Sequence, residues 1–154
     1  MSLIQRKGRT LQRDNENYRN DPEALVIKEQ VNNWIRQVEE LYSFIESVLA
    51  GHEVEFKKNT NISMYEKPME EHGLSAEEDP ILDLYRSGKL IATFKPLGLW
   101  VTGGRGRIDI LTETSGFLLT DVSESRNAPE WKVFSPEKSE NFDDKFITNL
   151  INSQ

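Results

Sequence analysis

The chain has 154 residues, a net charge of −7, no cysteine and two histidines, His52 and His72. These numbers exclude a disulfide framework and a thiolate metal site, and neither histidine has the spacing of a metal ligand or a catalytic triad. No apolar run approaches the roughly 20 residues that cross a bilayer, and no secretory signal is visible. We therefore expect a cytoplasmic, non-catalytic protein that binds no cofactor, no metal and no membrane.

Positive charge is concentrated at the start of the chain. Residues 1–13 contain no acid and four basic residues, Arg6, Lys7, Arg9 and Arg13. We predict a flexible or disordered basic arm over residues 1–20 and a single domain over residues 21–154. A nucleic-acid adaptor that uses this arm is one alternative function, but the acidic remainder of the chain disfavours it.

A long amphipathic helix is predicted over about residues 22–50. Asp21 is a suitable N-cap and Pro22 a suitable first residue, because proline lacks an N–H that would be unpaired there. Apolar residues then recur at helical spacing: Val31, Trp34, Ile35, Val38, Leu41, Tyr42, Ile45, Val48 and Leu49. Gly51 is a natural end. The stripe is shorter than three heptads, which favours packing against a sheet over a coiled coil.

The rest of the chain predicts an antiparallel meander of about five to seven strands and a short C-terminal helix, which gives an α+β fold. Alternating residues predict a strand near residues 54–56, a turn at 59–61 and a strand near 62–66. Further strands are expected at residues 81–85, 90–94, 99–102, 107–111, 117–122 and 131–134. Pro96 and Gly98 should break or bulge the chain. Helical spacing defines the last element through Phe142, Phe146, Leu150 and Ile151.

The segment from residue 66 to 83 is acid-rich and contains prolines, and we expect it to be an exposed loop. Its acids are the candidate partner-binding residues: Glu70, Glu71, Glu77, Glu78 and Asp79. Exposed carboxylates attract a basic protein surface and speed association with it. The simpler interpretation is that they only keep the loop soluble.

A glycine-rich turn at residues 103–106 is the second candidate site. Glycines allow a backbone to approach a ligand, and neighbouring arginines bind anions. The residues that would form this site are Gly104, Arg105, Arg107 and Asp109. The pattern is neither a Walker motif nor a dinucleotide fingerprint, and a strand follows it, so a structural hairpin is the alternative.

The strand Gly106-Arg107-Ile108-Asp109-Ile110, with Pro96-Leu97-Gly98 before it, carries a resemblance. Together with Trp131 and the last helix it resembles small uncharacterised bacterial proteins that share a Gly-Arg-Ile/Val-Asp strand. The resemblance covers about residues 90–151 and implies a bacterial origin but no activity.

Three functions remain open at this point. An acidic domain without a catalytic constellation suggests a non-catalytic interaction protein, for example a neutralising, immunity-like partner of a basic protein. The alternatives are a small-ligand or nucleotide-binding domain that uses the hairpin at residues 103–109 and the nucleic-acid adaptor.

Overall fold

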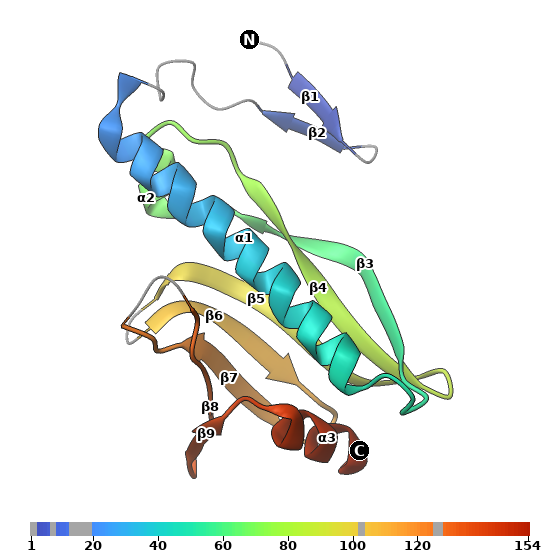
Figure 1. Cartoon of the computed structure of the whole chain (residues 1–154). Helices are drawn as coiled ribbons and strands as arrows, with labels where there is room; N and C mark the ends of the chain where they lie inside the picture. Colours follow the sequence, from blue (N-terminus) through green and yellow to red (C-terminus); the bar gives the residue numbers. More distant parts are fainter. Residues whose placement is uncertain (1–2, 7–8, 13–19, 102–103, 125–127) are drawn as a thin grey trace.

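A seven-stranded antiparallel sheet with two helices against one of its faces forms the main body of the computed structural model (Figure 1). The structure describes residues 3–6, 9–12, 20–101, 104–124 and 128–154. The helices are α1 (Pro22–Val48), α2 (Lys67–Glu71) and α3 (Asp144–Asn152). The strands of the sheet are β3 (Glu55–Met64), β4 (Glu77–Arg86), β5 (Lys89–Val101), β6 (Gly104–Leu111), β7 (Gly116–Asp121), β8 (Trp131–Phe134) and β9 (Ser139–Asn141).

The sheet is a simple meander, because the strands follow one another in space in the order in which they follow along the chain. Every neighbouring pair is antiparallel, as short connections require. The predicted α+β class, with a long N-terminal helix and a short C-terminal helix, is confirmed.

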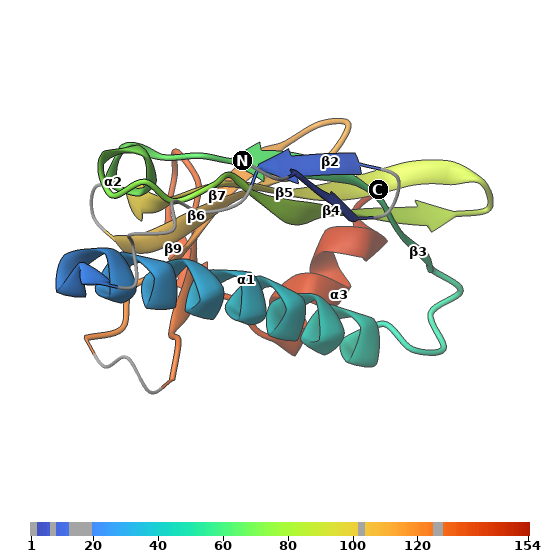
Figure 2. The same cartoon turned by 90° about the horizontal axis from the view of Figure 1, so that it is seen from above.

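Helix α1 begins as its sequence predicts. The Asp21 carboxylate accepts the backbone N–H of Glu23 at 3.0 Å, and Pro22 is the first helical residue. The helix ends at Val48, and Gly51 has a φ of +84°, which glycine adopts without strain. Figure 2 shows that α1 and α3 lie on the same face of the sheet and leave the other face open.

The core lies between this face of the sheet and the two helices. Asp143 caps α3 by accepting the N–H of Phe146 at 2.9 Å. The rings of Phe146 and Phe117 of β7 then meet edge to face, with centroids 5.5 Å apart. Apolar residues from α1, the sheet and α3 complete the core, among them Val38, Ile45, Leu82, Leu84, Phe94, Ile108, Ile110, Leu119, Ile147 and Ile151.

The predicted turn at residues 59–61 was wrong. These residues lie inside β3, where a register shift between Lys57 and Thr60 takes up the irregularity. The predicted break or bulge at Pro96 and Gly98 is confirmed as a bulge, and β5 continues through it as one strand. The short last strand β9 was not predicted.

The predicted exposed loop at residues 66–83 was also wrong. It contains α2 and the first part of β4, and it carries four buried side chains: Met69, Leu74, Asp79 and Leu82, which are 0%, 3%, 1% and 0% exposed. The apolar Met69 and Leu74 anchor the segment to the body, and the high acid content concealed them.

The N-terminal residues form a separate two-stranded hairpin, β1 (Leu3–Arg6) with β2 (Arg9–Gln12) (Figure 1). This hairpin is not part of the seven-stranded sheet. Lys7 and Arg13, two of the four basic residues predicted to form the arm, lie outside the described residues.

Candidate functional site

A pocket of about 490 Å³ opens between α1 and the β5–β6 hairpin. Its size is in the range of small-molecule sites, about 300–1,000 Å³. Nine described residues line it: Gln30, Asn33, Trp34, Gln37, Leu99, Trp100, Val101, Gly104 and Arg105. Apolar surface and a few polar groups are combined, as is usual for such sites.

One wall of the pocket is a single stripe of α1. Gln30, Asn33, Trp34 and Gln37 are spaced i, i+3, i+4 and i+7, which places them on one side of a helix. Trp34 is 1% exposed, and the three carboxamide side chains beside it are half-buried. The helix therefore presents uncharged hydrogen-bonding groups around an indole ring.

The opposite wall comes from the paired ends of β5 and β6. Trp100 lies opposite Arg105 in the register, and Val101 lies opposite Gly104. Among the residues that the structure describes, the Arg105 guanidinium donates one hydrogen bond, from Nη2 to the carbonyl oxygen of Glu124, at 3.1 Å. A guanidinium carries five N–H donors, so this contact orients Arg105 without using its full capacity.

Gly106 positions both walls. Its φ is +80°, and a Cβ atom at this residue would overlap the ring of Trp34. The register of β6 against β7 shifts between Arg105 and Arg107, so Gly106 forms a bulge, and its carbonyl oxygen accepts the Thr120 hydroxyl at 2.6 Å. Only glycine allows this bulge and lets Trp34 lie directly on the strand.

The buried carboxylate of Asp79 fixes the orientation of the Trp34 ring. The indole Nε1–H of Trp34 donates to Oδ2 of Asp79 at 3.0 Å. Burial, together with the negative charges of Glu66 and Glu77, raises the pKa of Asp79 to about 6, although the bond from Trp34 acts to lower it. Among the described residues, Oδ1 of Asp79 has no hydrogen-bond partner.

Glu66 holds the opposite wall. Its Oε2 accepts the backbone N–H of Leu99 at 2.8 Å, and its Oε1 accepts that of Trp100 at 3.2 Å. These two donors follow the bulge in β5, where the register shifts between Pro96 and Gly98. Glu66 thereby fixes the backbone that carries Trp100.

The structure divides the four residues of the predicted hairpin site. Gly104 and Arg105 line the pocket, but Arg107 and Asp109 do not. Arg107 donates from Nε to Oδ1 of Asp109 at 2.8 Å in a shallow hollow lined in part by Leu118. The Gly106 bulge explains the division, because it changes which face of the sheet the following residues occupy.

The five predicted partner-binding acids do not form one surface. Glu70 and Glu71 are exposed on α2, whereas Glu77 and Glu78 are half-buried and Asp79 is buried under α1. Glu77 also forms an ion pair with Lys28 of α1 at 3.2 Å. The cluster is therefore split between solvent, an ion pair and the core.

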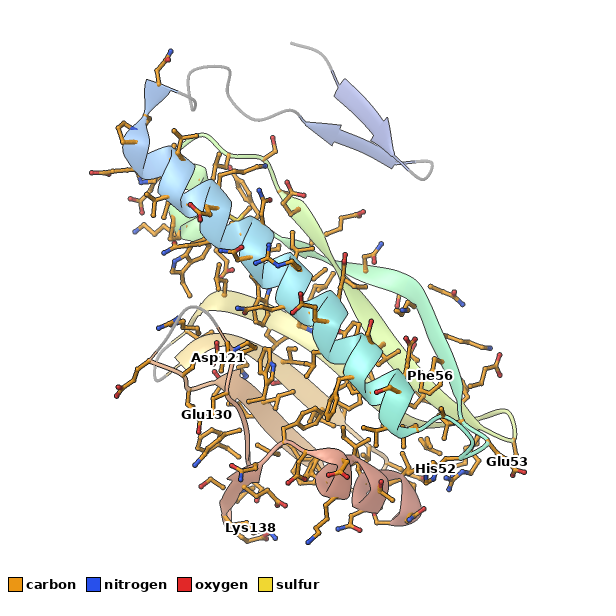
Figure 3. All side chains as sticks on the ribbon, viewed as in Figure 1. His52, Glu53, Phe56, Asp121, Glu130 and Lys138 are labelled. Atoms are coloured by element: carbon orange, nitrogen blue, oxygen red, sulfur yellow. The ribbon has the colours of Figure 1, made fainter. Side chains whose placement is uncertain are left out.

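Two further polar groups have structural explanations. Asp121, labelled with Glu130 in Figure 3, accepts the backbone N–H groups of Ser123 and Glu130, both at 2.9 Å, and so shapes the β7–β8 connection. His72 follows α2 and lies 3.4 Å from the carboxylate of Asp21, the N-cap of α1. It therefore ties α2 to the start of the long helix.

Sequence reasoning missed most of the pocket. A signal for the helical wall was available, because Gln30, Asn33 and Gln37 are neutral amides at helical spacing around a tryptophan. The pairing of Glu66 with β5 left no local signal, because the two lie 33 and 34 residues apart.

Comparison with known proteins finds no match. No protein-family model, curated protein or solved structure matches the chain.

Within the described ranges, no group of three or more histidine and acidic side chains is placed to hold a metal ion. In the same part of the chain, no helix has the length and apolar character needed to cross a membrane.

Proposed function

We propose that this protein is a non-catalytic domain that binds a small molecule between α1 and the β5–β6 hairpin. The observation that carries the proposal is the pocket of about 490 Å³, in which Trp34 and Trp100 stand on opposite walls with amide groups around them. Aromatic surface with a small number of polar groups is the composition of ligand sites.

Local structure around the pocket supports this proposal. Asp79 holds Trp34 and Glu66 holds the backbone of Leu99 through hydrogen bonds, and Gly106 positions both walls through a backbone at positive φ. A buried carboxylate under a tryptophan is not needed for a stable core, because burial of a carboxylate is energetically unfavourable. Such departures from simple packing are typical of functional sites.

Arg105 is the one ionisable side chain among the nine lining residues. A binding function fits this set better than catalysis, because general acid–base chemistry needs a titratable group within reach of the ligand. The small-ligand interpretation therefore takes precedence over the protein-partner interpretation, whose acids are dispersed.

A ligand-observed NMR screen of soluble fragments tests the proposal. We expect several fragments to bind the native chain and to lose binding in Trp100→Ala. Phe134→Ala is the matched control, because Phe134 is an aromatic strand residue 36% exposed and outside this pocket. Circular dichroism checks that both variants are folded. Fragments that bind equally to both variants, or no binding at all, would refute the proposal.

A further inference from the structure

We infer that the ligand is a planar heteroaromatic molecule with a ring N–H and a single negative charge, such as an aromatic carboxylate. This inference rests on the proposed function and adds the shape and charge of the ligand. It comes from three features of the lining: the aromatic walls, the charge balance and the amide groups.

The shape follows from the tryptophans. Trp100 of the strand wall is half-buried and offers indole surface to a molecule in the pocket, whereas Trp34 of the helical wall is 1% exposed and closes the pocket at its base. Aromatic rings pair in offset-stacked or edge-to-face geometry, which adds to the effect of burial alone. A flat, unsaturated ring gains this term, whereas a puckered ring of the same size does not.

The charge follows from Arg105. It is the only charged residue among the nine that line the pocket, and a guanidinium binds carboxylates through two parallel hydrogen bonds. None of the nine described lining residues is acidic, and the acids that support the walls accept hydrogen bonds from them: Glu66 from the N–H groups of Leu99 and Trp100, and Asp79 from Trp34. A single guanidinium in the lining matches a ligand with one negative charge and leaves most of the charge of a polyphosphate unpaired.

The amide groups indicate which hydrogen-bonding groups the edge of the ligand carries. Oε1 of Gln30 is buried and, among the described residues, has no hydrogen-bond partner. A buried acceptor without a donor is unfavourable, and rotation of the Gln30 side chain toward a bound molecule would let a ring N–H of that molecule satisfy it. Asn33 already accepts a bond from Arg36 at 2.7 Å through its Oδ1, which leaves its NH₂ group to donate.

Isothermal titration calorimetry with three matched probes tests the inference. Indole-3-acetate has the flat ring, the N–H and the negative charge; tryptamine has the same ring with a positive charge; cyclohexaneacetate has the negative charge without a flat ring. We expect indole-3-acetate to bind at least about tenfold more tightly than either of the other probes, because each of them lacks one of its interactions; tenfold corresponds to about 1.4 kcal/mol.

Two arginine variants then locate the charge. We expect Arg105→Ala to weaken indole-3-acetate about tenfold or more, the loss of one charged hydrogen-bonding pair. Arg107→Ala should leave the affinity unchanged, since Arg107 lies two residues further along the same strand but pairs with Asp109 outside the pocket. Equal losses in both variants would overturn the assignment of the charge to Arg105.

The failures of the two proposals are distinguishable. Preference for tryptamine would overturn the charge of the ligand, and equal binding of cyclohexaneacetate would overturn its shape, while the pocket would still bind molecules. If no probe binds but the fragment screen finds other ligands that depend on Trp100, the inference is wrong and the proposed function stands. If the screen is also empty, both are wrong.

Discussion

The two ends of helix α1 rest on very different surroundings. Toward its C-terminus, Ile45 and Leu49 pack with α3 residues such as Ile147 in an apolar core. Toward its N-terminus, Trp34 rests on a glycine bulge and a buried carboxylate, beside an open pocket. The C-terminal half of α1 therefore stabilises the fold through apolar packing. The N-terminal half contacts buried polar groups that reduce stability.

This contrast indicates which part of the fold is specialised for binding. Apolar packing needs no unusual backbone and no unpaired group. The pocket half has a residue at positive φ under an indole ring, Gly106, and an Asp79 carboxyl oxygen that has no partner in the described part of the chain. Substitutions in the apolar half should change stability and leave ligand binding unchanged. Substitutions in the pocket half should change ligand binding in a way that does not follow their effect on stability.

The largest effect is expected for Ile147→Ala in α3. Ile147 is fully buried, and truncation of such a side chain lowers the free energy of unfolding by about 2–5 kcal/mol. Urea denaturation measures this loss. Binding of indole-3-acetate at low denaturant should be unchanged; weakened binding in the folded variant would show that the two halves are not independent.

Gly106→Ala should lower the free energy of unfolding by about 2–4 kcal/mol, because the backbone φ is positive and the added methyl group overlaps Trp34. This variant should also shift the indole N–H resonance of Trp34 in a ¹H–¹⁵N spectrum. Gly116→Ala is the control, because only an ordinary contact with Leu111 lies near its Cβ position. Equal stability of the two variants would contradict the close approach of Trp34.

Asp79→Asn should change how stability depends on pH. The folded state raises the pKa of Asp79 from 3.8 to about 6, so this group binds more protons in the folded than in the unfolded state between these values. The free energy of unfolding should therefore fall by about 3 kcal/mol in total as pH rises from well below 3.8 to well above 6, and stay lower at higher pH.

The asparagine variant keeps an oxygen that can accept the Trp34 N–H, but it cannot ionise. The difference in unfolding free energy between the variant and the native chain should increase by about 2 kcal/mol from pH 4 to pH 7. Denaturant titrations at several pH values measure it, and the subtraction removes the contributions of acids that do not interact with Asp79. A difference that does not vary with pH would show that Asp79 ionises normally.

The smallest effect is expected for Glu66→Gln. Its side chain can still accept one backbone N–H, but it loses the charge that binds both donors, so the free energy of unfolding should fall by about 1 kcal/mol. The expected signature is local: amide hydrogen exchange should accelerate at Leu99 and Trp100 more than at Phe94. Uniform acceleration along β5 would contradict the role of Glu66 in holding the pocket wall.

The sequence predicted the elements well and their junctions poorly. The apolar stripe of α1 and the alternation of Ile108 and Ile110 are strong periodic signals, and both were confirmed. The acidic segment was misread because charge was taken to mean exposure, although Met69 and Leu74 carry apolar side chains into the core. Local composition gives no information about what a segment packs against.

The candidate site could be predicted only in part. Arg105 and Gly104 were identified, but Gly106 was read as part of a turn, although a glycine within a strand pattern is also a signal for a bulge. That bulge separates Arg105 from Arg107. The roles of Asp79 and Glu66 depend on contacts with Trp34 and β5, which lie 33 to 45 residues away in the chain.

The most direct test of the pocket as a ligand site is a ¹H–¹⁵N spectrum of the native chain during titration with indole-3-acetate. The chain has three tryptophans, and each gives one indole N–H signal. We predict that the signals of Trp34 and Trp100 move progressively and saturate, with smaller changes at Trp131, which is outside the lining. Signals of Trp34 and Trp100 that stay fixed at millimolar ligand would contradict the account.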